Sequence, residues 1–257
     1  MRTILLILVA ALSAQGEPVT PTKKIRLFNG KDLTNFYVVL KDSKLQDPKK
    51  VFTASQGLIH ITGEEWGGLT TEKEYRDCHL VVEWKWGDKA WPPRVGKARD
   101  SGILLHGTGA DGAAGSGWLE SIEYQMIEGG TGDMLSVKGA NKPRMTVEVE
   151  VGADKQLYWK KGAPRVTRDS GRVNWWGRDL KWTDTFGVRG PKDVEKPVGK
   201  WNRSEVIAKG GYLKYILNGV VVNEGFDGSH TAGKIQIQSE AAEVFVRKME
   251  LRPLKGQ

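Results

Sequence analysis

Apolar residues recur at every second position along most of this sequence. The segment 80–86 shows the pattern clearly, and the segment 145–151 repeats it with apolar residues at its odd positions. Successive side chains of a strand point to opposite faces of a sheet, so a period of two predicts strands with one buried face. No long segment sustains helical periodicity. We therefore expect an all-β chain whose helices are few and short.

The connections between these segments are typical of antiparallel sheets. Asn218-Gly219 stands between two β-rich runs in the segment 211–222, which is a strong signal for a tight hairpin. Two further strands are expected at 233–238 and 244–251. Many strands with glycine-rich connections favour an antiparallel β-sandwich, or jelly roll, of two packed sheets with long loops.

The N-terminus predicts export. Arg2 precedes an apolar run at 4–12, and small residues follow that run. This is the layout of a secretory signal peptide, and the run is too short for a permanent membrane anchor. The alternative is a buried N-terminal strand. We expect a signal peptide at 1–16, a tether at 17–24, and a periplasmic or secreted protein without stable membrane insertion after cleavage.

The remaining segment, 25–256, has a length that suits a single large sandwich domain. It holds the one cysteine of the chain, Cys78, so no internal disulfide can form and stability must come from a packed core. The segment 164–197 combines aromatics, charges and breakers, and we interpret it as a long loop or insertion across one face. The net charge is +8, but the Lys and Arg residues are scattered, which argues against nucleic acid as a partner.

Three of the expected strands carry polar residues on one face. The three sets are Ser121, Glu123 and Gln125; Gln236, Gln238 and Glu240; and Asp100 with His106. If these strands are neighbours, the polar faces converge on a patch of carboxylates and amides, which is typical of a carbohydrate site. The alternative is an ordinary solvated sheet face. Gln and Glu are poor strand formers, however, and we favour a functional face.

Aromatic residues fit the same interpretation. The chain has ten tryptophans, most of which we expect in the core, while the others are available to stack on a sugar ring. Trp118, at the start of the first polar strand, is the candidate for stacking.

Histidine chemistry is less specific here. His106 is one of four histidines and has the side chain of a base near neutral pH or of a metal ligand, although a lone strand histidine is more often structural. No HxH, HExxH or Cys/His spacing occurs, so the sequence indicates no ligand set for a metal ion.

Several short motifs together carry a family resemblance. They are LFNGKDL at 27–33, DSGI at 100–103, SIEYQ at 121–125, KWN at 200–202, LNG at 217–219, QIQSE at 236–240 and ELRP at 250–253. In their order and coverage, over 25–254, the sequence resembles the 3-keto-disaccharide hydrolase domain family. The resemblance implies a concanavalin A- or laminin G-like sandwich, export, and activity on sugars whose C3 hydroxyl has been oxidised to a ketone.

The implied reaction assigns roles to the polar residues. A C3 ketone acidifies the C2 proton, so a base can remove it and the enolate can expel the C1 aglycone, after which water adds to the enone. We expect Glu123 to be the base, with His106 as the competing choice, and Glu240 to be the acid or a metal ligand. The expected substrate-binding residues are Gln125 and Gln238 for hydroxyls, Arg203 or Lys85 for the enolate, and also Trp118 and Asp100.

Two questions stay open at the level of sequence. A divalent metal ion on the oxyanion fits the implied chemistry, but its ligands cannot be derived. The same fold also serves non-catalytic carbohydrate-binding modules, which are the main alternative to an enzyme. A scaffold or adhesion domain would instead expose an apolar patch.

Overall fold

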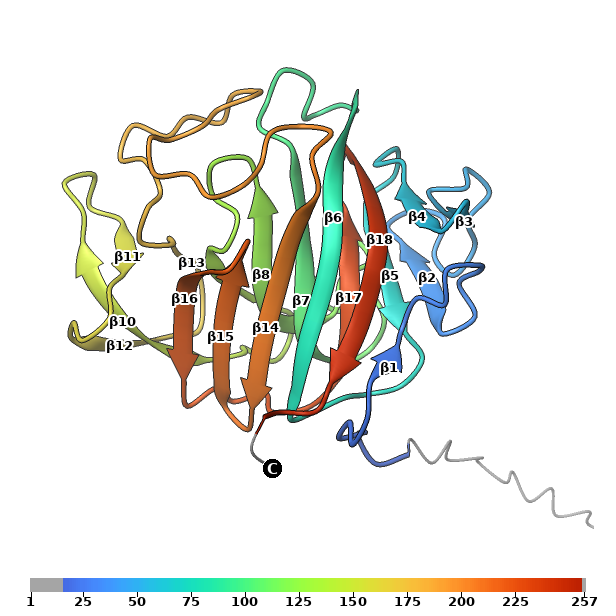
Figure 1. The fold of residues 1–257 in the computed structure, drawn as a ribbon, viewed down its shortest axis with the longest axis horizontal. Coiled ribbons are helices and arrows are strands. Elements are labelled where there is room, and N and C mark those ends of the chain that lie inside the picture. Colours follow the sequence, from blue (N-terminus) through green and yellow to red (C-terminus); the bar gives the residue numbers. More distant parts are fainter. Residues whose placement is uncertain (1–15, 256–257) are drawn as a thin grey trace, which may run out of the picture.

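A computed structural model describes residues 16–255 of the chain, and it shows two antiparallel β-sheets packed face to face (Figure 1). The strands are β1 Ile25–Arg26, β2 Phe36–Leu40, β3 Phe52–Ser55, β4 Leu58–Ile61, β5 Gly67–Thr71, β6 Cys78–Ala90, β7 Asp100–Thr108, β8 Glu120–Ile127, β9 Met134–Val137, β10 Met145–Val151, β11 Leu157–Trp159, β12 Arg165–Arg168, β13 Arg172–Val173, β14 Asn202–Lys209, β15 Tyr212–Leu217, β16 Val220–Phe226, β17 Lys234–Ser239 and β18 Ala242–Arg252.

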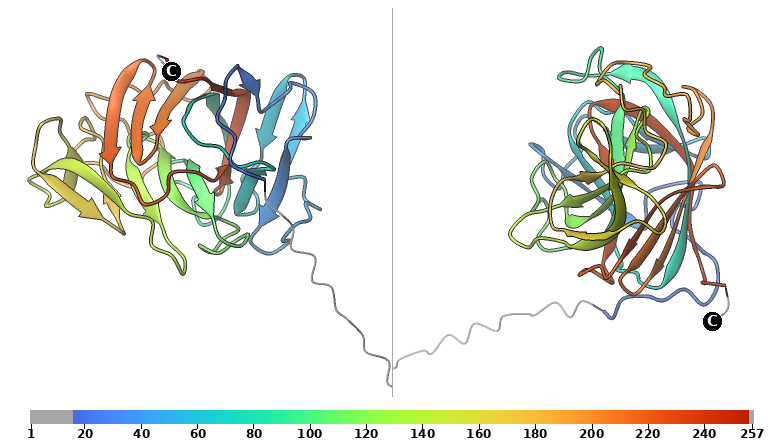
Figure 2. Two further views of the ribbon diagram at one scale, coloured as in Figure 1. Left: turned by 90° about the horizontal axis from the view of Figure 1, so that it is seen from below. Right: turned by 90° about the vertical axis from the view of Figure 1, so that its left-hand side faces the viewer.

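One sheet has eleven strands and the other has seven. The larger sheet follows the order β11-β10-β16-β15-β14-β6-β18-β4-β3, with β1 added to β18 and β12 added to β10. The smaller sheet follows the order β13-β9-β8-β7-β17-β5-β2. Seen from below, the orange strands of the larger sheet and the green strands of the smaller sheet form separate layers (Figure 2). The chain is thus an all-β sandwich of the jelly-roll kind, as predicted.

The core lies between the two layers and is built from the alternating apolar positions. Trp84 and Trp86 of β6 point inward, and their rings meet edge to face with centroids 5.0 Å apart. Ile122 and Tyr124 of β8 face them from the smaller sheet and are fully buried. Each buried indole N–H still needs an acceptor, and that of Trp84 donates to Ser204 Oγ at 2.9 Å.

The predicted strands form close to their expected bounds. The Asn218-Gly219 turn joins β15 to β16, and both of its residues have a positive φ, as a primed hairpin turn requires. The few short helices that were expected are not formed within residues 16–255, and no helix there could cross a membrane. Residues 1–15 of the predicted signal peptide lie outside the described residues.

The segment 164–197 differs from the predicted loop in one respect. It opens with two short strands, because β12 pairs with β10 and β13 pairs with β9. After Val173 the chain is irregular up to Asn202. This irregular part crosses one end of the sandwich and is drawn in yellow to orange in Figure 1.

Candidate functional site

Three neighbouring strands of the seven-stranded sheet bring the predicted polar residues together. β7 lies between β8 and β17, Gly102 pairs with Gln125, and Ile103 pairs with Ile237. The outward residues of β8 and β17 therefore lie on either side of β7, on the same face of the sheet. Gly102 has no side chain, and a Cβ at this position would collide with Oε1 of Glu123 and with Oε1 of Gln238. The glycine thus leaves the space in which these two side chains converge.

Glu123 is buried without a partner for one of its oxygens. Its Oε1 and the Oε1 of Gln238 are two of the eight buried side-chain polar atoms without a hydrogen-bond partner in the described chain. Both lie beside Gly102, so they form one polar site rather than two scattered defects. A buried unpaired acceptor is costly in a protein and therefore indicates a place where a ligand donor can bind. Burial, together with the nearby Asp100 charge, raises the pKa of Glu123 to about 8.

Two further carboxyl groups lie close to Glu123. Burial raises the pKa of Glu240 well above its ordinary value, and the Asp100 and Glu123 charges act in the same direction. Burial also raises the pKa of Asp100, although Arg94 opposes this effect. Arg94 Nη1 lies 3.3 Å from Asp100 Oδ2, so Asp100 is the carboxyl most favoured to stay ionised. The cluster can therefore hold protonated and ionised carboxyls side by side, as general acid–base chemistry requires.

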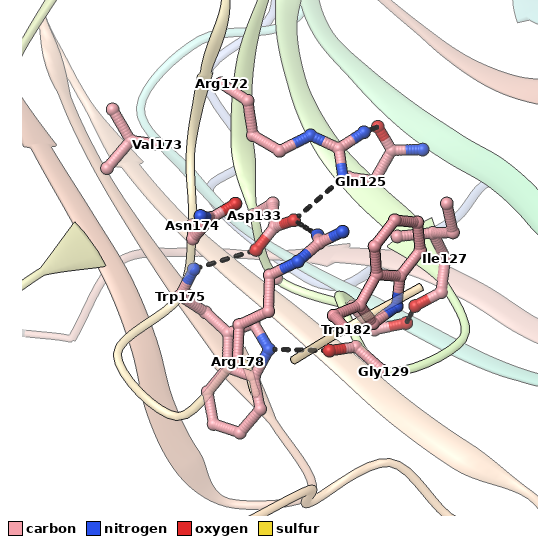
Figure 3. Close-up of polar contacts among 12 residues, drawn as sticks. Gln125, Ile127, Gly129, Asp133, Arg172, Val173, Asn174, Trp175, Arg178 and Trp182 are labelled. Atoms are coloured by element: carbon pink, nitrogen blue, oxygen red, sulfur yellow. Dashed lines mark hydrogen bonds and ion pairs between the residues drawn. The ribbon is translucent and has the colours of Figure 1, made fainter. Parts of the chain in front are cut away.

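Gln125 links this cluster to the edge of the sheet. Its Nε2 donates to Asp100 Oδ1, and its Oε1 accepts a bond of 3.3 Å from Arg172 Nη2 (Figure 3). Arg172 comes from β13, and its Nη1 lies 3.1 Å from Asp133 Oδ2. The amide therefore spans the distance between a carboxylate and a guanidinium and has no freedom to turn.

Two tryptophans flank the other side of the cluster. Trp118 and Trp66 stack with ring centroids 5.5 Å apart and an angle of 21° between their planes. Ser239 and Gly67 are the last paired residues of β17 and β5. The next residues along, Glu240 and Trp66, therefore lie beside each other. Trp118 Nε1 donates to the Gly67 carbonyl oxygen, which fixes the pair against β5. Both rings and Glu240 are partly exposed, so the cluster opens to solvent on this side.

Gln236 shares the polar face but has a structural role. Its Oε1 accepts from the Leu119 N–H at 3.2 Å, and its Nε2 donates to Thr70 Oγ1 and to the Gly117 carbonyl oxygen. The bonds to Leu119 and Gly117 tie the segment before β8 to the sheet.

The structure does not bring His106 to this cluster. The register shifts between Leu105 and Thr108, and His106 takes a left-handed conformation with φ of 54°. Its Nδ1 lies 2.8 Å from the His230 carbonyl oxygen, and burial lowers the pKa of His106 to about 4. The simple alternation that placed His106 on the face of Asp100 fails because the β-bulge adds a residue.

Arg203 and Lys85 also lie elsewhere, on the outer face of the eleven-stranded sheet. Arg203 forms ion pairs with Glu83 and Glu205, and Lys85 lies over the rings of Trp201 and Phe245. The whole core separates that face from Glu123. The sequence could not reveal this separation, because outward residues of either sheet have the same polar pattern.

The carboxyl cluster lacks the features of a site for a divalent metal ion. Within residues 16–255, no three His, Cys, Asp or Glu side chains are arranged to hold one. Arg94 and Arg172 lie near the three carboxyls of the cluster. Their positive charges repel a cation and so disfavour its binding there. The donor set therefore does not fit a divalent metal.

Sequence reasoning missed three residues of the site. Arg172 lies in a segment that was interpreted as a loop, and Arg94 lies in a connection without periodicity. Trp66 was not separated from the core tryptophans. A partial signal was present for Trp66, since it directly precedes the Gly67-Gly68 pair of β5, where small residues leave room for neighbours.

Comparisons with known proteins identify the family and the fold of the chain. Residues 23–252 match the model of the 3-keto-alpha-glucoside-1,2-lyase-like domain. No curated protein matches the chain significantly. Two crystal structures of proposed glycosyl hydrolases from Parabacteroides distasonis are similar, each at 18% identity over 91% of this chain. They cover 94% and 100% of those chains with TM-scores of 0.52 and 0.51, which shows a shared fold.

Proposed function

The chain belongs to the 3-keto-alpha-glucoside-1,2-lyase-like family, and on that basis we propose that it cleaves glycosides whose C3 hydroxyl has been oxidised to a ketone. The observation that carries the proposal is the buried, unpartnered Oε1 of Glu123, which lies opposite a second unpartnered acceptor on Gln238. A carboxylate in such a place is a strong base with a free lone pair, and sugar hydroxyls supply the missing donors.

In the first step Glu123 removes the proton from C2 of the sugar. The C2–H electron pair becomes the C2–C3 double bond of an enolate, and the C3 oxygen takes the negative charge. The raised pKa of Glu123, about 8, makes its ionised form a better base than an ordinary carboxylate. At pH 7 about one molecule in ten carries that form.

In the second step the enolate reforms the C3 ketone and breaks the bond between C1 and the glycosidic oxygen. A double bond forms between C1 and C2, and the departing oxygen takes a proton. Glu240 is suited to give this proton, because burial raises its pKa well above the ordinary value and so favours the protonated form. Addition of water across the new double bond would complete a hydrolysis.

The surrounding side chains are suited to bind the sugar. Gln238 offers an unpartnered carbonyl oxygen to a hydroxyl, and Gln125 holds Asp100 in place beside it. The Trp66 and Trp118 pair offers an apolar flank for the C–H face of a sugar ring. Carbohydrate is therefore the proposed partner.

The proposed location of this activity is the periplasm or the outside of the cell. Support comes from the charged and apolar pattern of the first 16 residues, with Arg2 before the apolar run. N-terminal sequencing of the protein recovered from the periplasm or medium tests it. A mature N-terminus near residue 17 is expected, whereas intact Met1 would contradict export.

A non-catalytic carbohydrate-binding module is the second candidate function. The stacked tryptophans favour it, because they would bind a sugar whether or not Glu123 reacts. Glu123→Gln distinguishes the two functions. An enzyme loses turnover when its base is removed, whereas a binding module keeps its affinity for the sugar.

The test is a 3-keto-glucoside with a chromogenic leaving group, offered to the wild type and to Glu123→Gln. We expect release by the wild type and a loss of about 10²-fold or more in the variant. Glu205→Gln is the matched control, because it makes the same change on the outer face of the larger sheet. Saturable sugar binding without release by the wild type would leave only the binding module. Parallel assays with a chelator and with added divalent ions test the absence of a metal requirement.

A further inference from the structure

Arg172 lies beside the carboxyl cluster with part of its hydrogen-bonding capacity unused. A guanidinium has five N–H donors, and in the described structure two of them meet acceptors, on Gln125 and Asp133. The side chain is 28% exposed, so a ligand can reach the remaining donors. Figure 3 shows the guanidinium directed toward the Gln125 amide.

We propose that Arg172 is the oxyanion-binding residue of this site, taking the negatively charged C3 oxygen of the enolate, and that Asp133 is the positioning residue that holds it there. The proposal rests on the proposed function, because the enolate forms only if the C2 proton is removed. A fixed donor aimed at developing charge is among the largest single contributions to catalysis.

The charge distribution supports Arg172 over the other nearby cation. Arg172 acts to lower the pKa of Asp100, Glu123 and Glu240, so it lies within electrostatic reach of all three carboxyls. Arg94 is already engaged, since it bonds to the Ala98 carbonyl oxygen, to Asp100 and to Asp184. Arg172 therefore has both the location and the free donors that a new anion requires.

Asp133 fixes Arg172 from a fully buried position. Its Oδ1 accepts the Trp175 backbone N–H at 2.8 Å, and its Oδ2 accepts from both Arg172 and Arg178. One carboxylate between two guanidinium groups compensates charges that would otherwise repel each other. Loss of Asp133 would release Arg172 from one of its two contacts.

Arg178 anchors the arrangement from its far side. A Cβ at residue 130 would collide with the Arg178 guanidinium, so Gly130 makes room for it. The Trp182 ring lies 4.0 Å from the guanidinium carbon, and Trp182 Nε1 donates to the Glu128 carbonyl oxygen at 2.8 Å. The irregular segment after β13 is thereby bound to the turn between β8 and β9. Through Arg178 this segment holds Asp133, the carboxylate that contacts Arg172.

The test compares Arg172→Gln, Arg172→Lys and Asp133→Asn with the wild type on the chromogenic 3-keto-glucoside. We expect Arg172→Gln to lower kcat by about 10²–10³-fold with a smaller change in KM, because the oxyanion forms after binding. Arg172→Lys keeps the charge and should recover part of kcat. In the wild type the Arg172 charge lowers the pKa of Glu123, so its removal should raise that pKa. The acidic limb of the kcat/KM profile should therefore move to higher pH in Arg172→Gln.

Positioning by Asp133 is tested by a double-mutant cycle. If Asp133 acts through Arg172, the double variant should be little worse than Arg172→Gln alone. Arg165→Gln is the matched control, because it removes an exposed arginine of β12 that pairs with Glu148. Circular dichroism checks that each variant is folded. The Arg172 variants are partly exposed and carry the test if Asp133→Asn fails to fold.

The outcomes separate the two proposals. Turnover by the wild type with kcat of Arg172→Gln within twofold, and an unmoved acidic limb, would overturn the role of Arg172 and leave the proposed function intact. Full additivity in the cycle would overturn the role of Asp133. A wild type that releases no leaving group would overturn the proposed function, and the oxyanion role with it.

Discussion

Glu123 and Gln238 converge over Gly102, and each has a buried Oε1 atom without a hydrogen-bond partner. The two residues come from strands that are not neighbours, since β7 lies between them. Their approach is possible only because the residue between them has no side chain. Two buried oxygens without partners at one site leave hydrogen bonds unmade, and the hydroxyl groups of a sugar can donate to or accept from them.

Gly102→Ala should abolish most of the activity. The new Cβ would collide with both Oε1 atoms, so Glu123 and Gln238 must move apart and the sugar loses its place. We expect kcat/KM on a 3-keto-glucoside to fall at least about 10²-fold. Gly162→Ala is a suitable control, since it places a Cβ in open space at a strained φ and should affect stability alone. Equal activity of both variants would contradict the crowding argument.

Glu123→Gln should raise thermal stability at alkaline pH. The folded pKa of Glu123 is raised to about 8, so the stability linked to its protonated form is complete below the unfolded pKa, near 4.3, and is lost as pH rises through 8. An amide stays neutral, and it can also donate to the Gln238 acceptor. We expect Tm at pH 9 to rise by about 2–4 °C for each kcal/mol gained, with little change at pH 4.

Glu205→Gln should change thermal stability in the opposite direction. Bonds from Arg203 lower the pKa of Glu205 despite its partial burial, so its ionised form stabilises the fold. That stability is present above the unfolded pKa and is lost as pH falls through the folded pKa. The variant should therefore be less stable than the wild type near pH 7. A rise in Tm for both variants would show that the two carboxyls do not differ as described.

The activity should depend on pH through the ionisation of Glu123. Below pH 8 the ionised fraction rises about tenfold for each pH unit, so kcat/KM should rise with the same slope. The acidic limb should bend near pH 8 rather than near the ordinary glutamate value. The same profile recorded with Trp66→Ala or Trp118→Ala is the control. A limb that bends near pH 4.5 would argue against Glu123 as the base.

Trp66→Ala and Trp118→Ala should weaken substrate binding with little effect on the chemical step. Each substitution removes half of the stacked pair that borders Glu240. We expect KM to rise about 2–10-fold at nearly constant kcat, which corresponds to the loss of one aromatic contact. Trp176→Ala, at an indole that is 40% exposed and bonded to the Val221 carbonyl oxygen, serves as the control. A fall in kcat without a change in KM would contradict a binding role.

Local pattern was sufficient to predict β8 and β17 and the faces of their residues. Alternation along 121–125 and 236–240 correctly separated Glu123, Gln125 and Gln238 from the core positions between them. The reason is physical, because successive side chains of a strand point to opposite faces whatever the rest of the chain does. His106 is the exception, since a β-bulge breaks the alternation and leaves no mark in the residue pattern.

Strand order is a property of the folded chain alone. Arg203 and Lys85 have the same outward pattern as Glu123, yet the tertiary structure places them on the opposite face of the molecule. Arg172 lies 47 residues from Gln125 in the chain, and only the pairing of β13 with β9 brings it to the site.

The sequence by itself determined the fold class, the polar faces of β8 and β17, and the family. The tertiary structure decided which cations reach the carboxyls, because ionic contacts depend on distances between segments that are far apart in the chain.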